Sequence, residues 1–192
     1  VRVVGLLPAA ENAIGGSAVR PGDVVRHYGG RTVEVDNTDA EGRIILADAM
    51  AYAAHFNPDV MVDLATLTGA CRVALGNELA GLFANDDALA AQIENLGRRT
   101  GDRVWRLPLL PEFREHLRSE WADMKNSGGR VGSLPSSAAF LERFVPEGVR
   151  WAHLDIAGVA HLPRGHNGLP AGATGFGVRL LLALLEDVAE KA

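Results

Sequence analysis

Several features that mark other classes of protein are missing from this chain of 192 residues. Its single cysteine, Cys71, excludes an internal disulfide and is expected to be a small buried residue on a helix. The chain does not open on a charged segment followed by a long apolar stretch, and no apolar run reaches the roughly 18 residues of a membrane-spanning helix. A formal net charge of −5 provides no basic surface for nucleic acid. These absences favour one cytoplasmic globular domain without a membrane or nucleic-acid partner.

What the chain does contain is an alternation of strand-like and helix-like segments, which is typical of α/β folds. Apolar or alternating runs predict strands at residues 2–7, 23–27, 32–35, 60–64, 80–84 and 150–156, with the second and third forming a hairpin. Helices are predicted at residues 41–55, 70–75, 87–98, 111–119, 136–144 and 175–188. The predicted fold class is therefore α/β, with a mixed sheet flanked by helices.

The densest group of charges lies between Asn37 and Arg43, immediately before an almost wholly apolar helix. Asp39 and Glu41 are two residues apart, so in an extended chain both carboxylates would project to one side, about 6.6 Å apart. Hard divalent cations bind such oxygens, and two metals roughly 3.5–4 Å apart can share the pair. Arg43 falls in the first helical turn, where the helix dipole disfavours a cation, so an anion is expected opposite it. That anion is either the two carboxylates or a charge that appears only during a reaction.

The same residues have a simpler interpretation as a helix start. Thr38 and Glu41 have the spacing of a capping box, in which the Thr38 hydroxyl accepts from the amide of Glu41 and the Glu41 carboxylate reaches back. Local sequence alone favours this cap over a metal site. A cap does not explain Arg43, however, nor the charge density before an apolar and therefore buried helix.

Two other groups of residues follow or occupy predicted strands. Thr66, Leu67 and Gly69 come after the strand that ends at Leu64, and loops at the carboxyl ends of strands are where open α/β sheets bind ligands. The alternative there is that Thr66 or Thr68 caps a helix. His153 and Asp155 share one face of a strand, where a buried hydrogen-bonded pair is a commoner arrangement than a metal pair.

The run VEVDNTDAEGRIILADAM at residues 33–50 resembles the signature of the leucyl aminopeptidase, or cytosol aminopeptidase, family, whose core is NTDAEGR. Other stretches resemble the family in the same order along nearly the whole chain: DLATLTGA at 63–70, GLFAND at 81–86, WRLPL at 105–109, ADMKN at 122–126, WAHLDIAG at 151–158 and GATGFGVRLL at 172–181. The resemblance implies a cytoplasmic metalloprotease, a hydrolase that assembles as a homohexamer. Such an enzyme uses two divalent ions (zinc, manganese or magnesium) to release leucine and other N-terminal amino acids from peptides.

Specific roles for individual residues also follow from the resemblance. Asp39 and Glu41 match metal-binding carboxylates, Asp39 also through its backbone carbonyl and Glu41 as the bridge between both ions. Arg43 matches a catalytic arginine that holds a bicarbonate near the attacking water. Leu67 matches the residue whose carbonyl takes the substrate amide, and Thr66, Gly69 and Ala157 match the lining of the pocket for the N-terminal side chain.

The sequence also departs from the family pattern. The family's remaining ligands, a lysine and two aspartates, and a second lysine that is catalytic, precede the signature in Gly-Lys-Gly and Phe-Asp-Ser-Gly-Gly runs that this sequence lacks. Its only lysines, Lys125 and Lys191, match neither position. Two carboxylates cannot fill two metal shells of about four to six ligands each.

We therefore interpret residues 1–192 as the C-terminal portion of a peptidase catalytic domain, with a partial sheet and part of an active site. The upstream catalytic segment and the N-terminal domain are absent, so the isolated chain is expected to be inactive. The alternative is a short homologue that has lost catalysis and acts as an oligomeric or regulatory subunit. An unrelated phosphoesterase that uses the same carboxylates is a third reading, which leaves the other motifs unexplained.

Overall fold

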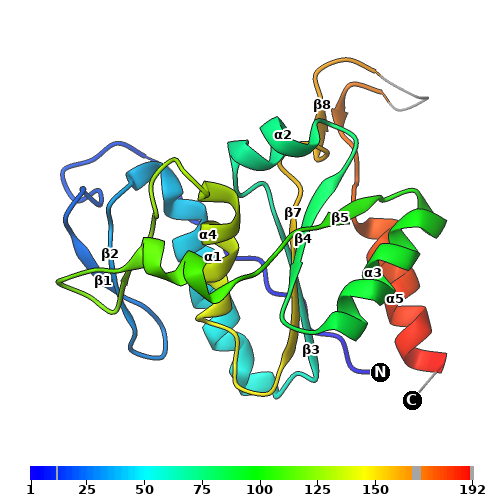
Figure 1. The fold of residues 1–192 in the computed structure, drawn as a ribbon, viewed down its shortest axis with the longest axis horizontal. Coiled ribbons are helices and arrows are strands. Elements are labelled where there is room, and N and C mark those ends of the chain that lie inside the picture. The colour runs from blue at the N-terminus through cyan, green and yellow to red at the C-terminus, as the bar shows by residue number, and fades with distance from the viewer. Residues whose placement is uncertain (12, 166–169, 191–192) are drawn as a thin grey trace. The chain divides into compact units, whose positions relative to one another are not determined.

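The computed structural model describes residues 1–11, 13–165 and 170–190, and the chain folds as two compact units (Figure 1). The first unit takes in Val1–Val3, Val60–Pro108 and Arg150–Ala192. The second takes in Val4–Asp59 and Leu109–Val149.

The first unit is built on a four-stranded mixed sheet in the order β3-β7-β4-β5. Its strands are β3 (Val60–Ala65), β4 (Ala80–Ala84), β5 (Val104–Arg106) and β7 (Arg150–Asp155). β3 runs parallel to β7 and β4 parallel to β5, whereas β4 and β7 are antiparallel. The helices of this unit are α2 (Gly69–Leu75), α3 (Asp87–Thr100) and α5 (Val178–Glu190), and β8 (His161–Leu162) pairs with β9 (Gly172–Ala173).

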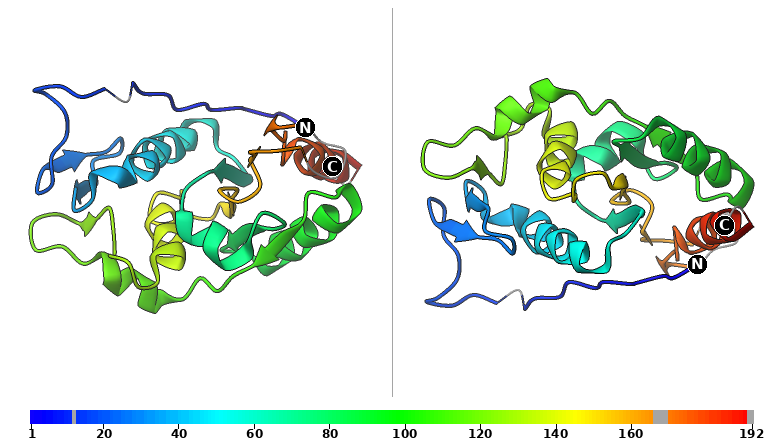
Figure 2. Two further views of the ribbon diagram at one scale, coloured as in Figure 1. Left: turned by 90° about the horizontal axis from the view of Figure 1, so that it is seen from above. Right: turned by 90° about the horizontal axis from the view of Figure 1, so that it is seen from below.

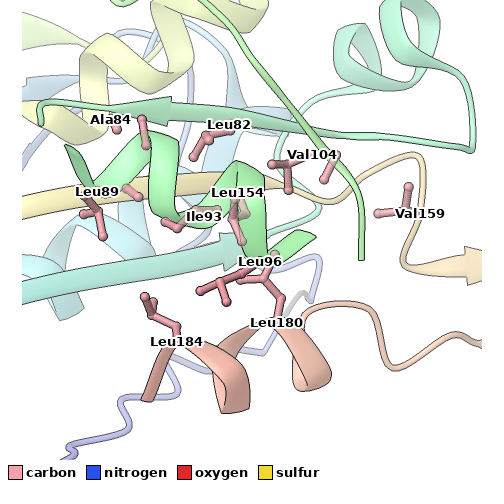
Figure 3. Packing of buried hydrophobic residues seen from close by; sticks show 13 residues of the cluster. Leu82, Ala84, Leu89, Ile93, Leu96, Val104, Leu154, Val159, Leu180 and Leu184 are labelled. Atoms are coloured by element: carbon pink, nitrogen blue, oxygen red, sulfur yellow. The ribbon is translucent and has the colours of Figure 1, made fainter. Parts of the chain in front are cut away.

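Period-two alternation along the strands divides the side chains of this sheet between its two faces. Leu82 of β4 and Leu154 of β7 point to the face that packs against α3 and α5, where they join Ile93, Leu96 and Leu180 in a buried apolar cluster (Figure 3). Figure 2 shows α5 lying alongside α3. The alternate positions of β7, Trp151, His153 and Asp155, are buried as well, so this strand has no solvent-facing side beyond Arg150.

The second unit combines a three-stranded sheet, in the order β1-β2-β6, with two helices. β1 (Val24–Arg26) and β2 (Thr32–Glu34) form an antiparallel hairpin, and β6 (Met124–Lys125) runs parallel to β2. Helix α1 (Glu41–Ala53) packs against α4 (Ser133–Glu142). Short 3₁₀ helices cover Thr38–Ala40, Ala54–Phe56 and Pro111–Leu117.

A buried histidine ties the hairpin to both helices. The Nδ1 atom of His27 lies 2.9 Å from Oδ1 of Asp48 in α1, and the backbone N–H of Tyr28 donates to the same oxygen (2.9 Å). The His27 ring packs against Phe140 and Phe144, at the end of α4. Burial lowers the pKa of His27 below its ordinary value, and the Asp48 carboxylate opposes that shift only in part.

The α/β class is confirmed, as are the hairpin and the strands expected near residues 60–64, 80–84 and 150–156. The strand expected at residues 2–7 is wrong: residues 1–11 form no regular element, and Val1 and Leu7 are largely exposed. A strand needs a neighbour to satisfy its backbone groups, and none of the described strands pairs with this segment.

Within the described ranges, no helix has both the length and the apolar character that spanning a bilayer requires.

Candidate functional site

The segment from Asn37 to Arg43 changes from extended chain to helix within a few residues. Asn37 is extended (φ −134°, ψ 115°), Thr38–Ala40 form a 3₁₀ turn, and α1 begins at Glu41. The side-chain oxygen of Asn37 accepts a hydrogen bond from the backbone N–H of Asp39 (3.0 Å) and so caps the turn. The charged cluster is therefore the start of a helix that is preceded by its own capped turn.

This geometry corrects two expectations. Asp39 and Glu41 are not in extended backbone, because they flank Ala40 at the junction of the 3₁₀ turn with α1, and helical residues two apart do not share a face. The capping box is also wrong, since no described side chain caps the start of α1. The cap forms earlier, at Asn37, because asparagine caps a helical turn at least as well as threonine.

The carboxylates of Asp39 and Glu41 are exposed to solvent. Among the described residues, no hydrogen bond and no ion pair involves an oxygen of either carboxylate. Two anionic oxygen donors are thus presented on a short segment whose backbone is held on both sides. Carboxylates of this kind fit the ligand preference of hard divalent cations.

Arg43 lies two residues further on and is directed into the protein. Only 8% of the residue is exposed, and its Nη1 donates to the backbone carbonyl oxygen of Asn126 (2.7 Å). The partner of this N–H is therefore a backbone carbonyl dipole. The contact links α1 to the stretch that follows β6.

That stretch, Asp123–Asn126, makes structural contacts that the sequence alone did not predict. Oδ2 of Asp123 accepts from the backbone N–H (2.8 Å) and the hydroxyl (2.9 Å) of Thr32. Both hydrogen bonds lower the pKa of the Asp123 carboxyl, and the bond from the backbone N–H has the larger effect. Lys125 Nζ lies 3.5 Å from a carboxylate oxygen of Asp36, and Asn126 is fully buried. The ADMKN motif could have indicated these contacts, because an asparagine at the end of a strand has both donors and acceptors for hydrogen bonds to neighbouring backbone.

In the first unit, the predicted substrate-binding residues follow two adjacent parallel strands. β3 leads into Thr66, Leu67 and Gly69, and β7 leads into Ala157, with Ala65 opposite Asp155 at the carboxyl ends. The structure thus brings these four residues into one region, at the edge of the sheet where α/β proteins bind ligands.

A single buried carboxylate ties the two loops together. Asp155 accepts from the hydroxyl of Thr68 (2.7 Å) and from the backbone N–H of Ala157 (3.1 Å), and none of its surface is exposed. The Thr68 hydroxyl also accepts from the backbone N–H of Cys71 (3.0 Å), so the helix-cap alternative is correct for Thr68. Thr66 remains exposed.

His153 and Asp155 are buried, but they bond to different partners. His153 Nδ1 lies 2.6 Å from Oδ1 of Asp63, whose other oxygen accepts from the Trp151 indole (2.7 Å). Cys71 is buried on α2 as expected, and burial raises the pKa of its thiol to about 11. Because the carboxylates of Asp63 and Asp155 are engaged inside the protein, they are not available to complete a metal shell.

Across residues 1–11, 13–165 and 170–190, no three side chains of histidine, cysteine, aspartate and glutamate meet in a way that could hold a metal ion. Among these described residues, Asp39 and Glu41 offer exposed carboxylate oxygens that no third such side chain joins.

Comparison with known proteins shows which protein family this chain matches. The cytosol aminopeptidase family, catalytic domain, matches residues 1–182. A probable cytosol aminopeptidase of Chlorobaculum tepidum is 57% identical over 187 residues, which make up 97% of this chain and 37% of that protein. This chain therefore spans well under half the length of that relative.

Two of the solved structures that resemble the chain illustrate the likeness. A mutant of tomato leucine aminopeptidase has a TM-score of 0.83 and 44% identity, covering 91% of this chain and 34% of that one. The bottromycin maturation enzyme BotP, in complex with Mn, has a TM-score of 0.86 and 45% identity, covering 91% and 39%. With a match from the first residue to residue 182, an α/β fold of the same kind and the carboxylate segment at its helix start, this chain belongs to the cytosol aminopeptidase family and corresponds to part of its catalytic domain.

Proposed function

We propose that the protein releases leucine and other N-terminal amino acids from peptides by metal-assisted hydrolysis. The observation that carries this proposal is the pair of exposed carboxylates, Asp39 and Glu41, which have no partner among the described residues. Exposed carboxylates on a fixed backbone are what a divalent metal site needs from the protein. Family membership supplies the reaction class, since the relatives are named aminopeptidases.

In this proposal the carboxylates of Asp39 and Glu41, together with the backbone carbonyl of Asp39, would hold the divalent ions. When bound, zinc, manganese or magnesium would polarise the scissile carbonyl and lower the pKa of a bound water. Each ion needs about four to six ligands, so other protein groups and water must complete both shells. The Mn complex of BotP supports manganese as one candidate.

Arg43 has a different proposed role, because its guanidinium is held in the protein by the Asn126 carbonyl. A planar guanidinium with a fixed orientation can hold a small planar anion such as bicarbonate, which would accept the proton of the attacking water. This role makes Arg43 the catalytic residue of the segment, separate from the metal ligands.

The loops after β3 and β7 are proposed to bind the peptide. The Leu67 carbonyl would accept from the substrate amide, and Thr66, Gly69 and Ala157 would line the pocket for the N-terminal side chain. The buried Asp155 supports this assignment, because it fixes both loops through Thr68 and Ala157. We also propose a cytosolic location, as in the names of the relatives, and assembly as a homohexamer.

Hydrolysis of leucine p-nitroanilide by the full-length gene product tests the proposal. Activity is expected, should disappear after chelation by EDTA, and should return on addition of manganese or zinc. N-acetyl-leucine p-nitroanilide, which lacks the free amine, is the matched control and should not be cleaved. A folded full-length protein that cleaves neither substrate in the presence of metal would overturn the proposal and favour a non-catalytic subunit.

A further inference from the structure

Asn126 occupies an unusual position beside the carboxylate segment. It is fully buried, it follows β6, and its own backbone N–H donates to the carbonyl of Glu34 in β2 (2.9 Å). This bond continues the parallel pairing of β6 with β2, so the residue is anchored to the sheet before its side chain makes any contact. The side chain therefore extends from a fixed point.

All four hydrogen-bonding positions of the Asn126 carboxamide are used on residues 36–40. Its Oδ1 accepts from the backbone N–H groups of Asp36 (2.9 Å) and Asn37 (3.2 Å). Its Nδ2 donates to the carbonyl oxygens of Asn37 (2.7 Å) and, over a longer distance, Ala40 (3.4 Å). A carboxamide has two acceptor and two donor positions, so every hydrogen bond that this side chain can make goes to one short segment.

The position of these bonds matters more than their number. Ala40, whose carbonyl Asn126 contacts, lies between Asp39 and Glu41 and has φ −104° and ψ 35°, outside the helical region. This backbone conformation sets the directions in which the side chains of Asp39 and Glu41 leave the main chain. The bonds to Asn37 secure the other side of Asp39, so the side chain of Asn126 holds the turn from both ends.

The carbonyl of Asn126 extends the same control to Arg43, whose Nη1 it accepts at 2.7 Å. The segment with the two proposed metal ligands and the proposed catalytic arginine are thus both bonded to one asparagine, which touches neither substrate nor metal in the proposed mechanism. An aspartate could not replace it, because one carboxylate oxygen would face the carbonyls of Asn37 and Ala40 without a proton to donate.

We propose that Asn126 is a positioning residue for the metal-binding and catalytic segment. This inference rests on the proposed function and names the group that sets the geometry of Asp39, Glu41 and Arg43. Displacement of ligands by as little as about 1 Å can cost roughly 10²-fold in rate. The loss should appear in kcat and in metal retention, whereas KM should change little because the side chain and carbonyl of Asn126 bond to residues 36–43, outside the loops proposed to bind substrate.

Two variants of Asn126 and one matched control test this in the full-length protein. Asn126→Ala removes the carboxamide, and Asn126→Asp keeps its shape and acceptors but removes the donors. The control, Asp123→Ala, removes two hydrogen bonds from the same stretch to Thr32 and leaves residues 36–43 alone. Four quantities are compared: kcat, KM, bound manganese after gel filtration, and amide hydrogen exchange of residues 36–43.

Both Asn126 variants are expected to lose roughly 10- to 100-fold in kcat and part of their manganese, with faster exchange at residues 36–43 and a KM close to wild type. Asp123→Ala should lower thermal stability alone. If folded Asn126 variants match Asp123→Ala in kcat, manganese and exchange, the positioning role is wrong. If the wild-type protein itself has no activity, the proposed function fails, and exchange at residues 36–43 still decides the role of Asn126.

Discussion

The carboxylates of this chain fall into two groups that differ in how they are used. Asp63, Asp123 and Asp155 each accept hydrogen bonds from residues far away in sequence, and so contribute to the folded structure. Asp39 and Glu41 are exposed and have no such partners among the described residues. Substitutions in the second group should therefore affect function far more than stability.

Glu41→Gln is expected to remove nearly all hydrolysis of leucine p-nitroanilide by the full-length protein, because it removes a proposed ligand of the divalent ions. Asp39→Asn should act similarly, with weaker retention of metal. Neither change should alter the free energy of unfolding by more than the roughly 0.5 kcal/mol typical of surface substitutions. Glu112→Gln, another exposed carboxylate at a helix start, is the control and should behave as wild type. Activity within a few-fold of wild type in Glu41→Gln at saturating manganese would contradict the ligand assignment.

At the scale of secondary structure, the elements with a strong local signal were predictable and those fixed by distant contacts were not. The long amphipathic and apolar runs gave α1, α3 and α5, and the Gly-Gly turn gave the β1–β2 hairpin. The short strands β5, β6, β8 and β9 were missed, because two or three residues carry no period and depend on their partner for definition. The strand expected at residues 2–7 shows the converse, an apolar run without a described partner.

The same reasoning explains what was missed at the candidate site. The residue types of the Asn37–Arg43 segment were legible, but its backbone conformation depends on Asn126, which is 89 residues away from Asn37. Local sequence offered Thr38 as the cap, and only the structure shows that Asn37 takes this role. Likewise, the sequence around Thr66 and Thr68 does not show that the Thr68 hydroxyl is the one that donates to Asp155.

The hydrogen bond from Thr68 to Asp155 gives a prediction for the loop between β3 and α2. Thr68→Val should lower the free energy of unfolding by about 1–3 kcal/mol, because the buried Asp155 loses a donor and the amide of Cys71 loses its cap. Thr66→Val, two residues earlier and exposed, should cost less than about 0.5 kcal/mol. Urea unfolding of the two variants makes the comparison, and equal losses would show that the Asp155 tie does not stabilise this loop.

The attachment of the β1–β2 hairpin to α1 and α4 should make stability depend on pH. Burial holds the pKa of His27 below its unfolded value of about 6.5, so the unfolded chain binds the proton first as the pH falls. The contribution of His27 is therefore fully present above about pH 6.5 and is lost as the pH falls toward the folded pKa. Between about pH 7.5 and 5.5, wild type should lose more stability than His27→Gln. His161→Gln, in which an exposed histidine is replaced, should keep the wild-type slope.

At the scale of the whole molecule, each compact unit carries a different part of the proposed machinery. The second unit holds Asp39, Glu41 and Arg43, and the first holds the loops after β3 and β7. The chain covers 37% of the length of the Chlorobaculum tepidum relative, and no described cluster of three ligands could hold a metal ion. The described residues therefore offer Asp39 and Glu41 to a metal ion without a third side-chain ligand of these types beside them.

These 192 residues, expressed alone, should bind manganese, zinc or magnesium only weakly and hydrolyse no leucine p-nitroanilide. The cause is the ligand count, since Asp39 and Glu41 offer two carboxylates and a tight site needs about three or more protein ligands to offset the desolvation of the ion and its ligands. Isothermal titration calorimetry with each metal, beside the activity assay, measures both properties, and Glu41→Gln should abolish even the weak binding. Submicromolar binding at two sites with measurable hydrolysis would mean that other residues of this chain complete both shells, contrary to the ligand count.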